Sequence, residues 1–572
     1  MTRSEDFDYG PARDFFVISF ECDRVNNYLP LPQNLNYRAL HMSDHVVSQS
    51  SPGRRLKFSQ IFNVAVPFID RHFDEGRGEK IAIRTNRDIE VSYSQLQINV
   101  NRCANGLLAL GLGHGDRLVM VIKDCAEFFY CFWGAIKVGI IPIPINTLLR
   151  SGDYRFIIAD SQCRAVVYSP EFAAEVEPAM DKLYLEESSR APEHAIRTEG
   201  KGNSFQAMIA AAQTEVEVVP TRAEDDCFWL YSSGSTGNPK GTIHRHRDMA
   251  VTSQYYGVET LGVVESDICF SAAKLFFAFG LGNGMTFPLW VGGTTILDDA
   301  RPTPDSTSKT IRKFRPTLYF GVPTLYMTQL QSMQTTQFDT SSVRYCVSAG
   351  EPLPGEILKQ WRDRTGLDIL DGIGSTETLH TFISNRAGDI RPGSSGRLVA
   401  GYQARILGDD DLPVATGESG QLMIKGDSIA RSYWNNPQKT ASHMVGEWLK
   451  TGDTYFQDED GYYHYCGRND DMIKVGGIWC SPFEIEATLM EHSAVLETAV
   501  IGRADDAGLV KPEAYVVLKQ ASTQTRQLAD ELTQHCKSSL APYKYPRWIR
   551  FVDELPKTVT GKIQRYKLRA LA

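Results

Sequence analysis

Cysteines are sparse in this sequence, and no two of them form a C-x-x-C pair. The chain has 572 residues and 11 cysteines, which are scattered along it. Structural zinc sites and disulfide frameworks need cysteines at close, regular spacings. Neither kind of site is therefore expected. The thiols are typical of a reducing compartment, and we expect a cytoplasmic protein.

Long apolar runs and an excess of positive charge are also missing. The most apolar region, residues 128–145, is interrupted by Lys137, Pro142 and Pro144. It falls short of the roughly 20 apolar residues that a membrane-spanning helix needs, and residues 1–10 are too polar for a signal peptide. The formal net charge of −9 argues against non-specific nucleic-acid binding. We expect neither a membrane nor a nucleic acid as a partner.

Two common nucleotide-binding motifs are absent. A Walker loop needs G-x-x-x-x-G-K followed by Ser or Thr, but Lys240 follows Pro239 and precedes Gly241. In GIGSTE at 372–377, Glu377 stands where a dinucleotide fold needs its third glycine. A carboxylate there would repel a pyrophosphate unless a metal ion intervened. P-loop hydrolysis and NAD binding are therefore disfavoured.

What the sequence does contain is a dense run of small and hydroxyl residues, YSSGSTGNPKG at 231–241. It directly follows FWL at 228–230, which is typical of a buried strand. Glycines let backbone N–H groups approach an anion, and Ser and Thr add donors. Lys240 adds a mobile positive charge. The stretch predicts a phosphate-binding loop; the alternative is a Ser/Gly-rich surface turn.

The length predicts two or more domains. Residues 1–55 show no regular period, and we expect an extension that packs poorly. Residues 56–468 alternate helices with short apolar strands, as in a helix over 92–110 followed by a strand over 117–122. Such alternation indicates an α/β fold with largely parallel sheets. Within it, residues 186–203 are expected to form a polar loop.

A smaller unit is expected over residues 469–572. SPFE at 481–484 places Ser at the N-cap, Pro at the first helical position and Glu at the third, which predicts a capping box. The apolar segments 499–501 and 514–518 predict strands. A further helix is expected to carry three apolar residues on one side: Leu528, Leu532 and Cys536.

Three further motifs are weak singly. TGD at 451–453 alone indicates a turn, GRNDDMIKVGG at 467–477 a solvated linker, and PKTVTGK at 556–562 a loose surface lysine. However, all three follow the loop 231–241 and GSTE at 374–377 in a fixed order. In this order they resemble the superfamily of acyl-adenylate-forming enzymes, which includes acyl-CoA synthetases, adenylation domains of peptide synthetases and beetle luciferases. The resemblance covers roughly residues 57–572.

Within that superfamily the chain is similar to the benzoate-CoA ligase branch. The similarity rests on KLFFAFGLGN at 274–283, DGIGSTE at 371–377, LH at 379–380 and LAPYKYP at 540–546. It implies a large N-terminal domain of layered α/β subdomains and a small mobile C-terminal α+β domain. It also implies ATP, Mg²⁺ and coenzyme A as cofactor and co-substrates.

The resemblance further implies roles for individual residues in ATP binding. Thr376 would contact the α-phosphate, Glu377 would hold Mg²⁺, and Lys562 would bridge the carboxylate and the α-phosphate in the transition state. Asp453 would take the ribose hydroxyls, with Arg468 nearby. The β- and γ-phosphates would be held by Ser232, Ser233, Gly234, Ser235, Thr236, Gly237 and Lys240. The adenine would be lined by Gly350, Glu351, Pro352, Asp371, Gly372 and Ile373.

In the superfamily the small domain rotates between the two half-reactions. The acidic hinge residue aligns here with Asp470. After rotation, the loop carrying Lys474, Gly476 and Gly477 would form the tunnel for the pantetheine arm of CoA.

The resemblance implies a binding site for an aromatic carboxylic acid. The resemblance assigns its lining to Ala278, Phe279, Gly280, Gly321, Gly374 and His380. This segment lacks the aspartate with which amino-acid adenylation domains hold an ammonium group, so an amino acid is disfavoured. Relatives typically carry Tyr at Phe279 and bulkier apolar residues at Thr378 and Thr381. A more polar pocket edge is therefore expected, and benzoate and an ortho-substituted benzoate such as anthranilate both stay open.

Other functions remain alternatives at this point. The enzyme could load an aryl acid onto the phosphopantetheine of a carrier protein, because the thiol arm is chemically the same. A luciferase-like oxidase and a catalytically inactive scaffold protein are the others, although Lys562, Glu377, Asp453 and Arg468 argue against inactivity. The expected assembly is a homodimer.

Overall fold

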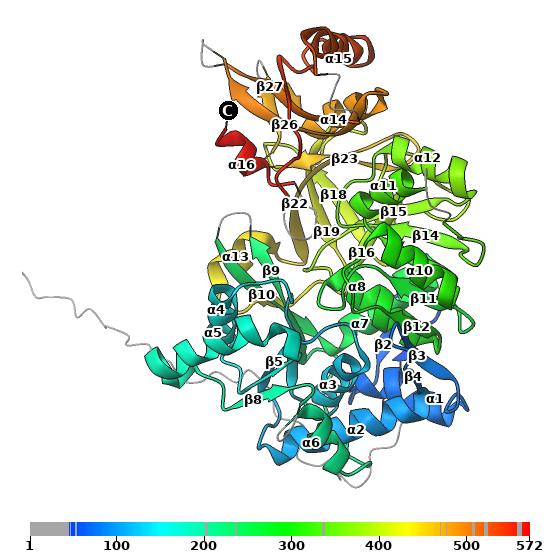
Figure 1. Cartoon of the computed structure of the whole chain (residues 1–572), viewed down its shortest axis with the longest axis vertical. Helices are drawn as coiled ribbons and strands as arrows, with labels where there is room; N and C mark the ends of the chain where they lie inside the picture. The colour runs from blue at the N-terminus through cyan, green and yellow to red at the C-terminus, as the bar shows by residue number, and fades with distance from the viewer. Residues whose placement is uncertain are drawn as a thin grey trace, which may run out of the picture. The chain divides into compact units, whose positions relative to one another are not determined.

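The computed structural model describes residues 45, 47–51, 54–200, 204–234, 237–333, 338–469, 471–475, 478–505, 509–519, 524–557 and 563–571. Among these, the largest sheet has nine strands (Figure 1). Its six central strands are parallel and its edge strands antiparallel, as the alternation in the sequence predicted. The strand order is β17 (Arg397–Leu398), β16 (Thr381–Ser384), β15 (Ile369–Gly374), β14 (Tyr345–Ser348), β13 (Leu318–Gly321), β11 (Ile268–Ser271), β12 (Thr294–Leu297), β3 (Ile81–Thr85) and β4 (Glu90–Ser92).

Helices connect the parallel strands of this sheet. Three are longer and amphipathic or polar on the outside: α10 (Pro304–Phe314), α11 (Pro323–Ser332) and α12 (Gly355–Thr365). The segment between β11 and β12 is compact and almost wholly buried. It contains α8 (Ala278–Leu281), the π-helix η6 (Gly282–Thr286) and α9 (Phe287–Val291).

A second, four-stranded sheet is parallel throughout, with the order β6 (Ile141–Pro144), β5 (Arg117–Val121), β7 (Ala165–Tyr168) and β8 (His194–Arg197). The expected helix over 92–110 is confirmed as α2 (Tyr93–Ala109). Ser92 and Gln95 form a capping box at its start, which satisfies two backbone N–H groups. The neighbouring helices are α3 (Ala126–Lys137), α4 (Ser151–Ser161), α5 (Ala173–Glu186) and α6 (Phe205–Ala211).

The prediction of a polar loop over 186–203 was wrong in part. Residues His194–Arg197 form β8, which pairs in parallel with β7. Because β8 is an edge strand, its backbone bonds to one neighbour and only Ile196 is buried. A strand that buries a single apolar residue leaves no periodic signal in the sequence.

Antiparallel sheets complete the rest of the large region. One joins β9 (Asp226–Gly234), β10 (Gly237–Arg245) and β20 (Ser432–Tyr433), and β10 leads into α7 (His246–Thr252). Another contains β18 (Gln403–Leu407), β19 (Gly420–Lys425), β21 (Met444–Val445), β22 (Trp448–Gln457) and β23 (Tyr463–Arg468). Helix α13 (Pro437–His443) lies between β20 and β21 in the chain. The predicted buried strand at 228–230 is thus the middle of β9.

The described part of the last hundred residues forms smaller sheets with three helices. The expected strands are confirmed as β26 (Val495–Ala504) and β27 (Val510–Leu518), and β28 (Trp548–Phe551) joins them. The expected last helix is α15 (Arg526–Ser539), with Leu528, Leu532 and Cys536 buried. Also present are β24 (Ile473–Val475), β25 (Ile478–Cys480), α14 (Pro482–Glu491) and α16 (Arg565–Arg569).

The predicted capping box of α14 is only half formed. The Ser481 hydroxyl accepts a hydrogen bond from the backbone N–H of Glu484. The Glu484 carboxylate, however, accepts two hydrogen bonds from Lys544 Nζ, at 2.9 and 2.7 Å. A charged partner competes well with a backbone N–H, so the reciprocal bond of the box is not made.

The first described residues pack onto the large region. β1 (Val47–Ser48) pairs with β2 (Lys57–Phe58). His45 is buried, and its Nδ1 accepts a hydrogen bond from the backbone N–H of Asn63. Of the expected extension, His45, Val47 and Ser48 are therefore held by burial and strand pairing.

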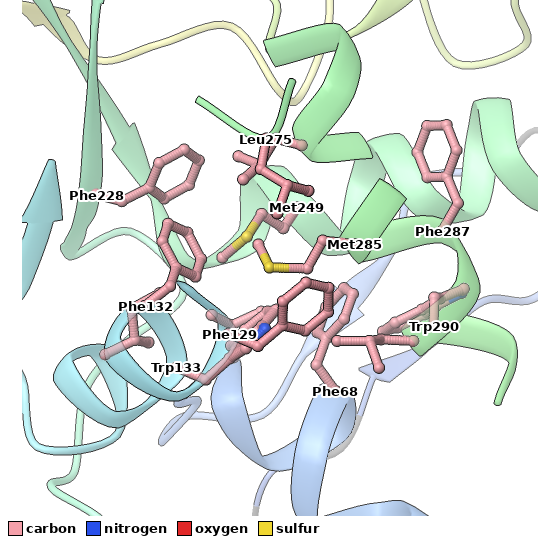
Figure 2. Packing of buried hydrophobic residues seen from close by; sticks show 14 of the residues in the cluster. Phe68, Phe129, Phe132, Trp133, Phe228, Met249, Leu275, Met285, Phe287 and Trp290 are labelled. Atoms are coloured by element: carbon pink, nitrogen blue, oxygen red, sulfur yellow. The ribbon is translucent and has the colours of Figure 1, made fainter. Parts of the chain in front are cut away.

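Aromatic side chains dominate the largest hydrophobic core (Figure 2). Phe68, from the π-helix η2 (Val66–Asp70), stacks on Trp133 of α3 with ring centroids 5.0 Å apart, and lies 5.1 Å from Trp290 of α9. Burying one such side chain contributes about 1.5–3 kcal/mol. This core anchors α9 and, with it, the compact segment between β11 and β12.

Thiols are withdrawn from the surface. Of the ten cysteines among the described residues, all are free and nine are buried, Cys125 being partly exposed. Burial raises the pKa of the Cys163 thiol to about 11 and that of Cys346 to about 12. In the part of the chain that the structure describes, no helix is long and apolar enough to cross a bilayer.

Candidate active site

The expected phosphate loop is the tip of the hairpin formed by β9 and β10. Lys240 pairs with Ser232 across the hairpin, and Gly237 with Gly234. Ser235 and Thr236 lie outside the described residues, as does the side chain of Ser233. The hairpin explains the non-Walker spacing, because this loop joins two antiparallel strands, not a strand and a helix.

Lys240 contacts Glu377 of the GSTE motif, although the two residues are far apart in the sequence. Its Nζ lies 2.9 Å from Glu377 Oε1 and 3.0 Å from the hydroxyl of Tyr433, which in turn donates to Glu377 at 2.7 Å. The lysine also lies 4.3 Å from the centre of the Tyr433 ring. Tyr433 is brought there by β20, which pairs with β10. Sequence reasoning missed Tyr433, which belongs to none of the motifs.

Glu377 remains ionised in this cluster. Burial alone would favour the neutral carboxyl, but the charge and hydrogen bond of Lys240, helped by Tyr433, lower the pKa of Glu377 to about 2. Within the described residues, no group of three or more His, Cys, Asp and Glu could hold a metal ion unaided. One ionised carboxylate nevertheless fits Mg²⁺, which commonly takes one or two carboxylates and completes its shell with phosphate oxygens and water.

A buried histidine holds the backbone of Thr376. His244, on β10, has its Nε2 2.8 Å from the backbone oxygen of Thr376 and its Nδ1 3.0 Å from Asp248. Asp248 also accepts the backbone N–H of Arg245 and caps α7. The sequence signal for this pair is the i,i+4 spacing of His244 and Asp248, which was overlooked.

The TGD motif lies in a strand, so the turn alternative was wrong. Asp453 of β22 is in register with Arg468 of β23, and Arg468 Nη1 lies 3.0 Å from Asp453 Oδ1. Gly452 has φ = 77°, and a Cβ on it would lie 2.9 Å from Arg468 Nη2. The positive φ favours glycine at this position, and the guanidinium of Arg468 passes close to it.

The expected adenine-lining residues lie at neighbouring strand ends. Gly350, Glu351 and Pro352 follow β14, and Asp371, Gly372 and Ile373 belong to the adjacent β15, with Ser348 opposite Asp371. Gly321, assigned to the acid site, ends β13 beside them. Carboxyl ends of parallel strands are where open α/β sheets bind ligands. The structure thus brings these segments to one edge.

Asp371 has an unusual ionisation. Its side chain is 5% exposed, and burial raises its pKa to about 8. The folded protein therefore holds a proton that the unfolded chain, with a pKa near 3.8, releases. Stability is lost as the pH rises from about 4 to 8.

We expect Asp371→Asn to remove this pH dependence. Relative to the parent protein, its free energy of unfolding should increase by at most about 1.4 kcal/mol per pH unit up to pH 8 and then level off. Urea unfolding without ligands at pH 5, 6.5, 8 and 9 measures the difference. The matched control is Asp267→Asn. Arg344 lowers the pKa of Asp267 despite its burial, so its cost should be constant above pH 5. A pH-independent Asp371→Asn difference would contradict the raised pKa.

Two predicted elements of the aryl site meet at His380. Ala278, Phe279 and Gly280 lie on α8, and His380 Nε2 lies 3.4 Å from the backbone oxygen of Phe279. The imidazole ring is 5.5 Å from the Phe279 ring and 4.5 Å from that of Phe287. Burial lowers the pKa of His380 to about 3, so the ring is neutral. Gly374 ends β15 on the same stretch.

Thr378, one of the two residues expected to make the pocket edge more polar, forms hydrogen bonds within its own turn. The Thr378 hydroxyl donates to the backbone oxygen of His380 at 2.8 Å and accepts the backbone N–H of Ser375. Thr378 is fully buried. Its hydroxyl therefore stabilises the turn that carries Glu377 and His380.

Several predicted residues cannot be placed. Asp470, Gly476, Gly477 and Lys562 lie outside the described residues, and Lys474 is exposed on β24. Their assigned roles stay predictions. The described part of the candidate site has four components. They are the hairpin of β9 and β10 with Glu377, the pair of Asp453 and Arg468, the ends of strands β13, β14 and β15, and the expected aryl wall, by which we mean α8 and His380 with the aromatic rings packed on them.

The chain is similar to known proteins along most of its length. The model of the AMP-binding enzyme family matches residues 70–434, and that of the AMP-binding enzyme C-terminal domain matches residues 484–562. The benzoate–CoA ligase of Thauera aromatica is 46% identical over 534 residues, which is 93% of this chain and 99% of that protein.

Two solved structures are similar along nearly their whole length. The anthranilate CoA ligase AuaEII in complex with anthranoyl-AMP has a TM-score of 0.84 and 42% identity, covering 90% of this chain and 98% of that one. A benzoate CoA ligase from Burkholderia xenovorans LB400 has a TM-score of 0.81 and 42% identity, covering 89% and 100%. The chain therefore belongs to the AMP-binding enzyme family, with the large N-terminal and small C-terminal domains of adenylate-forming enzymes.

Proposed function

We propose that the protein is an ATP-dependent, AMP-forming aryl-CoA ligase acting on benzoate or a substituted benzoate such as anthranilate. The observation that carries this proposal is that one turn bears both halves of the chemistry. Glu377, beside Lys240, is an ionised carboxylate suited to phosphate-bound metal, and His380, on the same turn, is a neutral ring packed against Phe279.

The nature of the wall supports an uncharged aromatic ring. Phe279, Phe287 and the neutral His380 supply flat, apolar faces, which favour offset or edge contacts with a ring. Ala278, Phe279 and His380 carry no acidic group that could hold an ammonium. Two of the similar proteins are named benzoate CoA ligases and one is named an anthranilate CoA ligase. These names support the same class of acid.

The reaction has two steps. An oxygen of the aryl carboxylate attacks the α-phosphorus of ATP, pyrophosphate leaves, and an aryl-adenylate forms. The sulfur of CoA then attacks the acyl carbon and AMP leaves. Positive charge and preorganised donors are needed where the carboxylate approaches the polyphosphate.

The family resemblance assigns roles in this chemistry to individual residues. The hairpin residues and Lys240 hold the β- and γ-phosphates, Thr376 contacts the α-phosphate, and Asp453 with Arg468 takes the ribose. Mg²⁺ at Glu377, when bound, neutralises phosphate charge. Lys562 stabilises the first transition state, and rotation about Asp470 then replaces it by the loop of Lys474, Gly476 and Gly477. We place the domains at 56–468 and 469–572, after an extension over 1–55, with an active homodimer in the cytoplasm.

The experiment that tests this function is mass spectrometry of reactions with ATP, Mg²⁺ and a panel of benzoates, with and without CoA. We expect aryl-CoA and AMP to appear together, with benzoate or anthranilate among the fastest acids. Aryl-adenylate without any thioester would instead indicate loading of a carrier protein. Pyrophosphate release with none of the acids would refute the proposal.

A further inference from the structure

We propose that Asp124, acting with Lys274, is a positioning residue that fixes the aryl wall and thereby selects which acids are accepted. This inference rests on the proposed function, because it assigns the acid site to the wall formed by α8 and His380. Asp124 belongs to none of the motifs that carried the resemblance, and Lys274 is only the first residue of the segment 274–283; neither residue has been given a role above.

Asp124 comes from a different part of the fold than the aryl wall that it holds. It follows β5 of the four-stranded sheet and is 6% exposed. Its Oδ1 accepts the backbone N–H of Leu275 at 3.1 Å, and its Oδ2 lies 3.8 Å from Lys274 Nζ. A buried carboxylate is stable only with such partners. The contact therefore links the four-stranded sheet to the segment between β11 and α8.

Lys274 links the same segment to a third part of the chain, the residues that follow β12. Its Nζ also donates to the backbone oxygens of Asp298 and Ala300, which follow β12. Three oxygens from two segments thus surround one ammonium group. Two of these oxygens accept hydrogen bonds and the third, on Asp124, lies at ion-pair distance, and the lysine side chain is only 19% exposed.

The anchored residues are joined rigidly to the wall. The side chain of Leu275 belongs to the same buried cluster as Met249 and Met285 (Figure 2). The backbone oxygen of Lys274 accepts the N–H of Phe277 at 3.0 Å. A Cβ on Gly280 would lie 2.1 Å from that same oxygen, so α8 packs directly on the Lys274 backbone.

A shift of the anchor must therefore move the wall. Gly280 and Phe279 are neighbours on α8, and Phe279 contacts His380 through both its ring and its backbone oxygen. Misplacing a substrate-positioning group by about 1 Å can cost about 100-fold in rate. Losing Asp124 should thus be felt at the acid, but not at the ATP-binding hairpin on β9 and β10.

The decisive variant is Asp124→Leu, which keeps the branching of the side chain but replaces both oxygens with methyl groups. We expect kcat/KM for benzoate to fall about 100-fold while the KM for ATP stays within about twofold. The ratio of kcat/KM for 4-methylbenzoate to that for benzoate should rise, because a loosened wall admits a longer ring. A merely destabilised enzyme would lose activity toward both acids equally.

Three further variants complete the test. Asp124→Asn keeps an acceptor for Leu275 and should lose no more than about tenfold, the value of one hydrogen bond. Lys274→Met removes the ammonium and should raise the 4-methylbenzoate ratio even if Asp124→Leu does not fold. The matched control is Asp267→Asn. Asp267 is equally buried, accepts the N–H of Val264 at 2.8 Å and pairs with Arg344 at 2.6 Å, so it should leave the ratio unchanged.

A ligand-free measurement separates this inference from the proposed function. Hydrogen–deuterium exchange of the peptide covering residues 273–281 should accelerate at least tenfold in Asp124→Leu and stay unchanged in Asp267→Asn. Unchanged exchange, or an unchanged acid ratio in both Asp124→Leu and Lys274→Met, would overturn the positioning role. Accelerated exchange in an enzyme that activates no aryl acid would refute the proposed function and leave the anchor in place.

Discussion

Replacing Lys562 with alanine should lower the rate of aryl-adenylate formation by about 100- to 1,000-fold. The second half-reaction, from preformed aryl-adenylate and CoA to thioester, should keep its rate. The reason is that the proposed lysine acts only while carboxylate and α-phosphate, both negative, approach each other. Once the anhydride exists, that repulsion is gone.

The two half-reactions can be measured apart. Pyrophosphate release reports the first, and thioester formation from synthetic benzoyl-AMP and CoA reports the second. A matched control is Lys557→Ala in the same terminal segment. Lys557 pairs with Glu497 at 2.7 Å, and a partly exposed pair of this kind contributes only about 0–1 kcal/mol. Equal loss of both half-reactions in Lys562→Ala would rule out the assigned role.

The second large effect is expected for Glu377→Gln. This change keeps the shape of the side chain but removes the charge, and a neutral amide is a poorer ligand for Mg²⁺ than a carboxylate. We expect adenylation to slow about 100-fold or more and the half-saturating Mg²⁺ concentration to rise. Lys240 Nζ lies 2.9 Å from this carboxylate, so the variant also removes the negative partner of that lysine.

Titrating the adenylation rate with Mg²⁺ at saturating ATP measures this effect. Tyr433→Phe is the control, because it removes one hydroxyl from the same cluster and leaves the carboxylate in place. It should slow adenylation far less, and its half-saturating Mg²⁺ concentration should match that of the parent. A Glu377→Gln enzyme with the parent's Mg²⁺ dependence would show that the metal is held elsewhere.

Local structure was predictable where the signal is local. Helix α2 could be expected because its apolar residues recur at helical spacing and Ser92 with Gln95 caps its start. The strand β9 could be expected from the apolar run at 228–230. The half-formed cap of α14 could not, because Lys544, sixty residues away, takes Glu484. Edge strand β8 was missed because pairing, not side-chain pattern, defines it.

The candidate site shows the same division. Motif order was enough to associate Lys240 with Glu377, but their direct contact spans 137 residues and depends on how β10, β15 and β20 are arranged. Tyr433 could not be found because its role comes from pairing between β20 and β10. The raised pKa of Asp371 is a consequence of its burial, which no motif encodes.

The burial of the cysteines makes the protein suitable for fluorescence spectroscopy. Thiolates, not thiols, react with maleimide dyes, so buried groups with raised pKa values are slow targets. A cysteine introduced at Phe73 or at Leu509, both 56% exposed, should react first once Cys22, which lies outside the described residues, is replaced by serine. One position lies in the large domain and the other in the small one. Energy transfer between two such dyes would follow the two domains through a single catalytic cycle.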